Sequence, residues 1–271
     1  MSVGVLGVLP GATQAADAIE PGEERFKLVL GAFLPAFGTD VRVDNPTLGR
    51  GTNTNLQDDF GVERDSSGVW AGAEWRFAPR HRVGFAYSHF KLDGSRTATR
   101  NIQIGDEVFP AGATVSAQLK LDLVPLTYSY SVYKRDGKEL ALTAGLHWSH
   151  AKLSAQGSAS LGGLDVSNDT SAKANMPLPL FGVRYDHAFR RDWSAGAQAA
   201  YFQIKYDKDP LNVDGALWSA RVHVEYRLSN HVGIGAAIEG FAIEVEASKD
   251  TWKGGLDYSY WGPQIYLTAR F

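Results

Sequence analysis

The sequence predicts an all-β fold, a transmembrane antiparallel up-and-down β-barrel, with ten strands as the simplest count. Three observations predict it. Apolar residues alternate with other residues along most of the chain, which is the period of a strand with two different faces. The polar faces of these strands carry charges of both signs. Short turns also alternate with long polar connections, a pattern typical of barrels that cross an outer membrane.

The composition excludes several other classes of protein. The 271 residues include 27 Lys and Arg against 30 Asp and Glu, a net charge of −3, so the chain lacks the basic excess of a general nucleic-acid binder. It has no cysteine, which excludes a disulfide scaffold, a thiol nucleophile and a Cys-ligated zinc. It has no apolar run near roughly eighteen residues, which excludes a bundle of membrane helices.

The first residues resemble an export signal. Val3 to Leu9 is a short apolar stretch, and Ala16-Asp17-Ala18 has the small-x-small pattern that signal peptidase accepts. The first basic residue is Arg25, so either the true start lies upstream or the segment is not a signal. We expect residues 1–18 to be a signal peptide and residues 19–271 to form a single barrel domain.

Each predicted strand has an apolar face made of alternate residues. In the first five strands these faces are Phe26, Leu28, Leu30, Ala32 and Leu34; Val69, Ala71, Ala73, Trp75 and Phe77; Val83, Phe85 and Tyr87; Leu119, Leu121 and Leu123, followed by Leu126, Tyr128, Tyr130 and Val132; and Leu140, Leu142, Ala144, Leu146 and Trp148. In the last five they are Phe181, Val183, Tyr185 and Phe189; the weaker segment 193–206; Trp218, Ala220, Val222, Val224, Tyr226 and Leu228; Val232, Ile234, Ala236 and Ile238; and Trp261, Pro263, Ile265, Leu267, Ala269 and Phe271.

Two features of these strands leave alternatives open. Small residues in 193–206 fit either face, so eight strands is the main alternative, and twelve would require the acidic segment 51–66 to form a hairpin. In the fourth strand the apolar positions change parity at Val124-Pro125. A β-bulge there would keep one face apolar and would explain a proline inside a strand.

The connections alternate in length. Short polar turns are expected at 78–81, 134–138, 190–192 and 229–231, and longer segments rich in Gly, Asn, Asp, Ser and Thr lie at 44–66, 96–113, 155–172, 207–214 and 247–255. Four short turns and five long connections join ten strands with both termini on the short-turn side. We expect the short turns in the periplasm and the long loops outside the cell.

Aromatic residues near the strand ends favour lipid as the partner of the apolar faces, since barrels carry aromatic girdles there. The opposite faces would then line the interior and form a paired charge network, because unpaired charge in a narrow lumen is costly. The residues predicted to form this network are Glu74, Arg76, Arg184, Asp186, Arg221, His223, Glu225, Glu239 and Arg270.

The C-terminal run resembles the last strand of Gram-negative outer-membrane proteins, which ends in Phe with alternating apolar residues before it. Ile265, Leu267, Ala269 and Phe271 match that assembly signal. The segments Trp75 to Arg82, Gly105 to Gly112 and Leu256 to Gln264 resemble a family of uncharacterised proteobacterial outer-membrane β-barrel proteins. The resemblance implies the fold and an integral outer-membrane location, and it implies recognition by the barrel-assembly machinery. It brings no activity or catalytic residues.

No catalytic or metal-ligating motif stands out. Ser88-His89 and Ser149-His150 are strand neighbours that point to opposite faces, so neither pair can act as nucleophile and base. Asp186-His187 would lie beside a short turn, away from an extracellular active site, and Asp58-Asp59 fits a solvated loop better than a rim site or a cation site.

We therefore expect a non-enzymatic outer-membrane barrel, either a narrow pore for small solutes or a structural and surface-interaction barrel. The alternative is an outer-membrane enzyme that acts on lipid or peptide at the extracellular rim. The expected partners are outer-membrane lipid and lipopolysaccharide and the assembly machinery, with no cofactor, metal or nucleic acid. The oligomeric state is left open.

Overall fold

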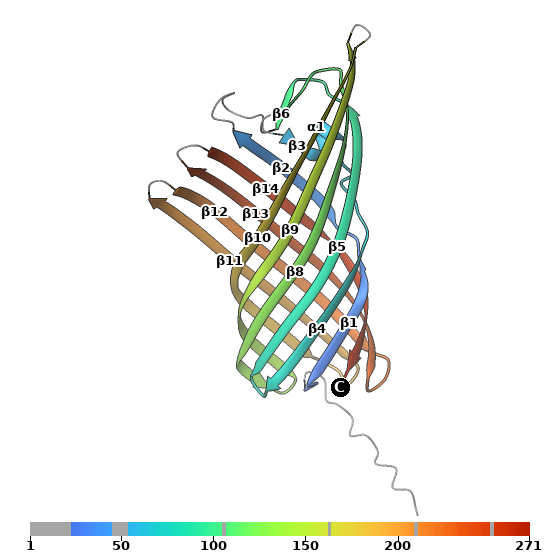
Figure 1. The fold of residues 1–271 in the computed structure, drawn as a ribbon. Helices are drawn as coiled ribbons and strands as arrows, with labels where there is room; N and C mark the ends of the chain where they lie inside the picture. Colours follow the sequence, from blue (N-terminus) through green and yellow to red (C-terminus); the bar gives the residue numbers. More distant parts are fainter. Residues whose placement is uncertain (1–22, 45–53, 105–106, 162–163, 209–210, 250–251) are drawn as a thin grey trace, which may run out of the picture.

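The computed structural model describes residues 23–44, 54–104, 107–161, 164–208, 211–249 and 252–271 (Figure 1). The expected signal segment 1–18 lies outside this described part. Nearly all described residues are in strands (Figure 1). None of the helices found in the described part is long and apolar enough to cross a membrane.

The described elements follow the chain in a simple order. They are β1 (Phe26–Phe33), β2 (Ala36–Asp44), β3 (Thr54–Asn55), α1 (Leu56–Phe60), β4 (Gly68–Ala78), β5 (His81–Thr97), β6 (Ile102–Ile104), β7 (Glu107–Phe109), β8 (Thr114–Arg135), β9 (Lys138–Leu161), β10 (Leu164–Ala188), β11 (Trp193–Lys208), β12 (Leu211–Arg227), β13 (Val232–Lys249) and β14 (Trp252–Arg270).

The wall is an antiparallel sheet that closes on itself. Each strand from β4 to β14, the short β6 and β7 aside, pairs with the next long strand, and β1 closes the ring by pairing with both β4 and β14. β2 continues along β14 after a break at Leu34-Pro35. The eleven labelled strands of the described wall therefore occupy ten positions, because β1 and β2 together fill one. The barrel prediction and the ten-strand count are confirmed.

The weak segment 193–206 is a regular strand. It is β11, which pairs with β12 along its whole length, so the eight-stranded alternative is wrong. The twelve-stranded alternative is also wrong for the described residues of 51–66, since they hold the short strand β3 and the helix α1. Asn55 caps α1 by accepting a hydrogen bond from the Asp58 N–H at 2.8 Å, and Gly61 ends it with φ of 66°.

The short turns lie where the sequence predicts them. They join β4 to β5, β8 to β9, β10 to β11 and β12 to β13 at one end of the barrel (Figure 1). In the β8–β9 turn, Asp136 and Gly137 have φ of 51° and 70°, the left-handed pair that a type I′ turn requires.

At the opposite end of the barrel, the sequence predicted five long loops, but the structure has extended strands in three of these segments. Strands extend through three of the expected loop segments, so that only 162–163, 209–210 and 250–251 separate β9–β10, β11–β12 and β13–β14, and these six residues are outside the described part. β8, β9 and β10, with 22, 24 and 25 residues, form the tallest section of the wall (Figure 1).

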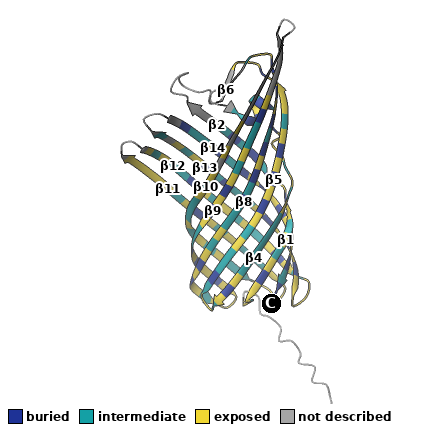
Figure 2. Ribbon diagram, viewed as in Figure 1, coloured by how far each residue is buried: buried dark blue, intermediate teal, exposed yellow. Residues whose placement is uncertain are grey.

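The apolar side of the wall changes part of the way up. Near the short turns, apolar side chains such as Leu142 and Phe85 are exposed on the outside. Farther from the turns, Leu121 of β8 and Phe90 of β5 are buried inside, and the outer positions of these two strands are polar. Figure 2 shows the resulting alternation of exposed and buried residues along the strands. The lower wall is therefore built for lipid and the upper wall for water.

This change of side contradicts the predicted bulge at Val124-Pro125. The register between β8 and β9 is continuous through both residues, and Val124 pairs with Trp148 and Pro125 with His147. The pairs with β5 are interrupted here, which follows from the missing N–H of proline. The β8 bulge lies instead between Ser131 and Tyr133, near the turn. The leucines change parity because the core replaces lipid as their partner.

The apolar core fills the upper interior and is capped by α1. Leu56 and Phe60 of α1 are 1% and 0% exposed, and the helix is held to β2 by a hydrogen bond from the Thr39 N–H to Gln57 Oε1 at 3.0 Å. Aromatic rings pack edge to face beneath it, with 5.6 Å between the ring centres of Phe33 and Phe90. The rest of the buried cluster is Phe37, Val62, Leu92, Ala98, Ala113, Val115, Ala117, Leu119, Leu121, Leu123, Ala155, Leu217, Phe241, Ile243, Tyr258 and Tyr260.

The inward placement of the core leucines predicts how substitutions on the two faces of β8 change the stability of the barrel. Leu121→Ala should lower the free energy of unfolding by about 2–5 kcal/mol, because it leaves a cavity among buried side chains. Ser116→Ala, on the outer face of the same strand, should change it by no more than about 0.5 kcal/mol. Urea unfolding of the chain folded in lipid vesicles, followed by tryptophan fluorescence, measures both. Equal losses would contradict the inward placement of Leu121.

Candidate functional site: the interior of the barrel

The lower interior is lined by charged side chains from every side of the wall. Strand alternation directs them inward, since their neighbours in each strand are the exposed apolar residues of the outer face. All nine residues named from the sequence lie here: Glu74 and Arg76 on β4, Arg184 and Asp186 on β10, Arg221, His223 and Glu225 on β12, Glu239 on β13 and Arg270 on β14.

Glu139 is the centre of one group of ion pairs. Its Oε2 is 2.7 Å from Arg76 Nη2 and 3.1 Å from Arg82 Nη2. Ser131 also donates a hydrogen bond to Oε1 of this carboxylate. Each of these three charged side chains is no more than 8% exposed, so the pairing replaces the water that these charges have lost.

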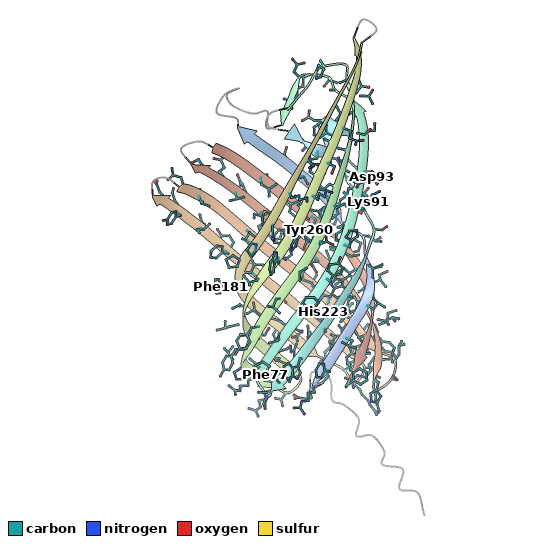
Figure 3. All side chains as sticks on the ribbon, in the orientation of Figure 1. Phe77, Lys91, Asp93, Phe181, His223 and Tyr260 are labelled. Carbon is teal, nitrogen blue, oxygen red and sulfur yellow. The ribbon has the colours of Figure 1, made fainter. Side chains whose placement is uncertain are left out.

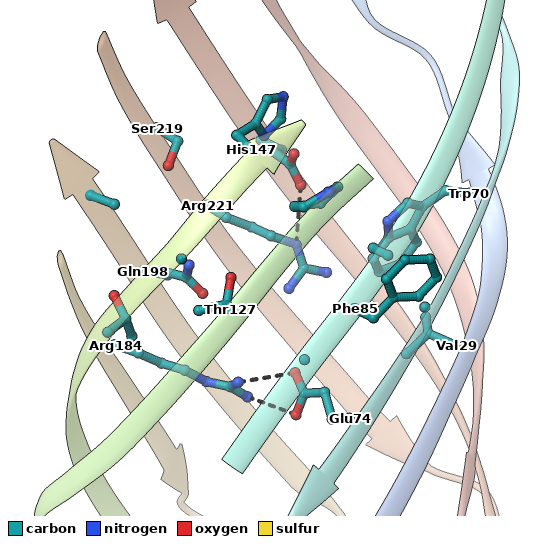
Figure 4. Close-up of a pocket in the computed structure, with 18 of the residues that line it drawn as sticks. Val29, Trp70, Glu74, Phe85, Thr127, His147, Arg184, Gln198, Ser219 and Arg221 are labelled. Atoms are coloured by element: carbon teal, nitrogen blue, oxygen red, sulfur yellow. Dashed lines mark hydrogen bonds and ion pairs between the residues drawn. The ribbon is translucent and has the colours of Figure 1, made fainter. Parts of the chain in front are cut away.

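Arg184 joins this group to the other side of the barrel. Its Nη1 is 2.9 Å from Glu74 Oε1 (Figure 4), and its Nε is 2.7 Å from Asp186 Oδ2. Arg82 contacts the same two carboxylates at 3.3 and 3.6 Å. Alternating arginines and carboxylates thus span the lumen from β4 and β5 to β10.

A second group surrounds Glu225 near the closing strand pair. Lys27 Nζ lies 2.5 Å from Glu225 Oε1, Arg270 donates to the other carboxylate oxygen, and Tyr266 donates its hydroxyl at 3.1 Å. His223, labelled in Figure 3, bridges the two groups, with its Nε2 3.7 Å from Asp186 Oδ1.

Arg221 heads a third group above these two. Its guanidinium lies 3.6 Å from Glu239 and donates to Gln264 Oε1 at 3.2 Å, and Gln264 donates to Glu239 at 2.9 Å. The guanidinium also lies over the rings of Trp70 and Tyr266, at 5.1 and 5.4 Å from their centres. These contacts hold Arg221 across the lumen, facing Trp70 (Figure 4).

Two small cavities flank the charged layer. The upper one, about 170 Å³, lies between the charges and the apolar core, and the lower one, about 250 Å³, reaches the short-turn end. Lys27, Arg184, His223 and Glu225 line both, so these ion-paired residues lie where the two cavities adjoin. His147 lines the upper cavity (Figure 4), and its ring is stacked on that of Phe241 with 4.3 Å between the ring centres.

The sequence reasoning missed three members of these groups: Lys27, Arg82 and Glu139. Their positions in the alternating pattern could have identified them. Lys27 lies between two apolar residues of a predicted strand, and Arg82 and Glu139 directly precede the first apolar residue of theirs. The same parity rule that selected Glu74 and Arg76 therefore also selects them.

The candidate catalytic pairs do not form active-site arrangements. Ser88 is buried inside, whereas the neighbouring His89 faces out and has its Nδ1 2.8 Å from Asp122 Oδ1. Ser149 and His150 diverge in the same way, with His150 stacked on Trp148 outside. No group of three or more His, Cys, Asp or Glu side chains suited to a metal ion occurs in the described part of the chain.

The two acidic candidates serve local structure. Asp58 pairs with Arg64 at 2.9 Å, and Asp59 pairs with Arg100 at 2.9 Å and accepts from the Asn55 N–H at 3.0 Å, so this loop pair stabilises the start of α1. Asp186 is held by Arg184, while His187 points to the outer side between Tyr185 and Phe189.

Comparison with solved structures identifies the fold. No protein-family model matches this sequence, and no curated protein sequence matches it. The structure of outer membrane protease OmpT from Escherichia coli is similar, with a TM-score of 0.61 and 11% identity over 91% of this chain and 96% of that one. The P. putida toluene transporter TodX (TM-score 0.37, 10% identity, 93% and 92% covered) and OprG from Pseudomonas aeruginosa (0.36, 10%, 92% and 97%) also match. The chain has the fold of outer-membrane β-barrel proteins.

The buried ion pairs make a second stability prediction. Glu139→Gln should lower the free energy of unfolding by about 3–5 kcal/mol, because Arg76 and Arg82 then face a neutral amide in a buried site. Arg64→Gln, which breaks the exposed pair with Asp58, should cost no more than about 1 kcal/mol. The same urea titration measures both, and a loss of less than about 1 kcal/mol for Glu139→Gln would show that the pairing contributes little.

Proposed function

We propose that this chain is a closed, non-conducting outer-membrane barrel that presents a tall strand wall at the cell surface. The proposal rests on two layers that obstruct the lumen one above the other, an ion-paired layer and an apolar core. The ion pairs around Glu139 and Arg184 span the lower lumen, and the apolar core beneath α1 fills the upper interior. Charged solutes would have to break buried pairs and then cross a dry core, and each step costs several kcal/mol.

The height of the wall supports a role in surface interaction. β10 has 25 residues, so at roughly 3.3 Å per residue it is about 80 Å long. With a tilt of about 40° it rises roughly 60 Å, more than twice the ~25 Å apolar band of such barrels. The upper half of β8, β9 and β10 is then available for contacts outside the membrane.

The C-terminal strand supports export to the outer membrane. Ile265 and Leu267 are exposed on the outer face of β14, Ala269 shares their parity, and the exposed Phe271 directly follows the strand. This is the alternation that the assembly machinery reads in the proteins that the C-terminal run resembles. We therefore include the assembly machinery and outer-membrane lipid among the proposed partners.

The enzyme alternative receives less support. OmpT is a protease, but at 11% identity its similarity extends only to the fold. Asp186 is engaged by two arginines at the short-turn end, and the exposed Asp122–His89 pair is bonded to the Tyr87 hydroxyl, which donates to Asp122 at 2.7 Å.

Planar-bilayer recordings test the closed state. The folded chain should give no steady conductance, and a variant that weakens only the core, Phe90→Ala/Phe241→Ala, should also be silent because the ion pairs remain. Adding Glu74→Ala and Arg184→Ala to that variant should open a path. Heat-modifiable gel mobility confirms that each variant is folded, and steady conductance from the unaltered chain would overturn the proposal.

A second candidate function rests on the pairing of β10 with β11. The two strands pair only from Phe181–Tyr201 down to the short turn, although both continue upward (Figure 1). Leu178, Leu180 and Phe202, just above the last pair, pack against the apolar core, and Leu180 lines the upper cavity. A small apolar molecule could pass sideways between lumen and membrane at this break.

The break can be measured by cysteine pairing, since the chain has no cysteine of its own. Val183→Cys/Ala199→Cys joins directly paired positions and should form a disulfide. Leu178→Cys/Ile204→Cys occupies the positions where the same register would continue, and it should stay reduced because the strands have diverged beyond the reach of about 7 Å between Cα atoms. Equal oxidation of the two pairs would remove the lateral route.

A further inference from the structure

Four lysines form a continuous row across the outer wall. Lys91 of β5 is directly opposite Lys120 of β8, which is opposite Lys152 of β9, which is opposite Lys173 of β10. All four side chains are exposed. Figure 3 shows Lys91 on the outer side of β5. At roughly 4.8 Å between neighbouring strands, four ammonium groups share about 14 Å of wall.

Such a row is unfavourable for the isolated protein. Like charges directly opposite each other in a sheet repel and destabilise it. Lys91 has a partner, Asp93, at 2.9 Å, and this bond with a hydrogen bond from Gln118 holds the pKa of Asp93 below its usual range. No ion pair links Lys120, Lys152 or Lys173 to a carboxylate of the described residues. The Asp93 carboxylate also attracts Lys120, and an anion from outside would relieve the repulsion that remains.

The row lies at the edge of the lipid-facing surface. Going down the wall, the next row is His89, Asp122, His150 and Asn175, followed by the aromatic side chains of Tyr87 and Trp148, and then by Phe85, Leu126 and Leu146. This order, apolar then aromatic then charged, is that of a membrane boundary. Lys91 is ten positions beyond His81, where β5 begins, and a tilted strand crosses the apolar layer in roughly 9–11 residues.

The opposite side of the barrel carries the reverse charge. At comparable positions on β12, β13 and β14, the outer face has Asp214 opposite Glu246 and Glu244 opposite Asp257, all exposed, and the row contains one lysine, Lys205 of β11, 3.7 Å from Asp214. The basic row is therefore a property of the β5–β10 side, and a general need for solubility does not account for it.

We propose that Lys91, Lys120, Lys152 and Lys173 bind the phosphate groups of lipopolysaccharide in the outer leaflet. This inference rests on the proposed location in the outer membrane. Phosphates at headgroup depth match a row of cations just above an aromatic girdle, and ammonium groups bind phosphate as point charges. The attractions of neighbouring lysines to an anionic membrane surface add together, so the row acts as one multivalent site.

The test replaces all four lysines by glutamine and measures binding of purified lipopolysaccharide to the folded full chain in neutral detergent. The quadruple variant should bind at least about tenfold more weakly than the unaltered chain, because most of the attraction to phosphate is lost. Lys→Arg at the same four positions should retain binding, since it keeps the charge. Glu244→Gln/Asp257→Asn, on the acidic side, should bind at least as tightly as the unaltered chain.

Two further arms identify the ligand group. Lipopolysaccharide stripped of phosphate should bind the unaltered chain as weakly as intact lipopolysaccharide binds the glutamine variant, and millimolar inorganic phosphate should compete only partly. Undiminished binding by the glutamine variant, or by the stripped lipid, would overturn the proposal. So would a lysine-dependent dimer with unchanged lipid binding, which would identify the acidic side of a second copy as the partner.

These measurements are independent of the closed-barrel proposal. Binding in detergent does not depend on conductance, and bilayer recordings do not depend on the lysines. A chain that conducts ions but binds lipopolysaccharide through the four lysines would overturn the closed-barrel proposal and support the lipopolysaccharide site. Membrane fractionation of expressing cells checks the shared premise, and recovery of the chain outside the outer membrane would overturn the lipid site.

Discussion

The whole structure depends on one constraint, that the same continuous strands pass from hydrocarbon into water. A strand offers two faces, and only one of them can be apolar at a given height. Below, lipid covers the outside, so Leu142 and Phe85 point out and the charges point in. Above, water covers the outside, so Leu121 and Phe90 point in. β8 makes the exchange at Val124-Pro125 with its register against β9 unbroken.

The contents of the lumen follow from this exchange. The lower interior receives the polar positions of every strand, and because it is too narrow to solvate them fully, arginines and carboxylates pair around Glu139, Glu74 and Glu225. The upper interior receives the apolar positions and closes with α1 as in a soluble domain. In the proposed closed state, the ion pairs and the apolar core together take the place of a plug domain.

Much of this was accessible from the sequence, for physical reasons. Alternation and turn chemistry are local, so the strands, the short turns and the ten positions of the wall could be predicted, and parity placed charges such as Glu74 and Arg184 on the inner face. The sequence could not predict which charged side chains form ion pairs, because partners such as Lys27 and Glu225 come from distant parts of the chain. The prediction of a bulge at Val124-Pro125 was wrong because it assumed that the apolar residues face the same side of the wall along the entire strand.

Above Phe181, no described strand pairs with the edge of β10 that faces β11. Unpaired backbone groups near lipid are costly and invite another chain to add a strand. Pro177 and Pro179 occupy β10 just above its last pair with β11, and a proline nitrogen has no hydrogen to donate. Proline is accommodated in a sheet where its nitrogen points away from the hydrogen-bonded neighbour strand. Pro177 and Pro179 would therefore remove hydrogen-bond donors from the edge of β10 that faces β11. This edge is therefore a poor template for a further strand, so the divergence of β10 from β11 need not lead to polymerisation along it.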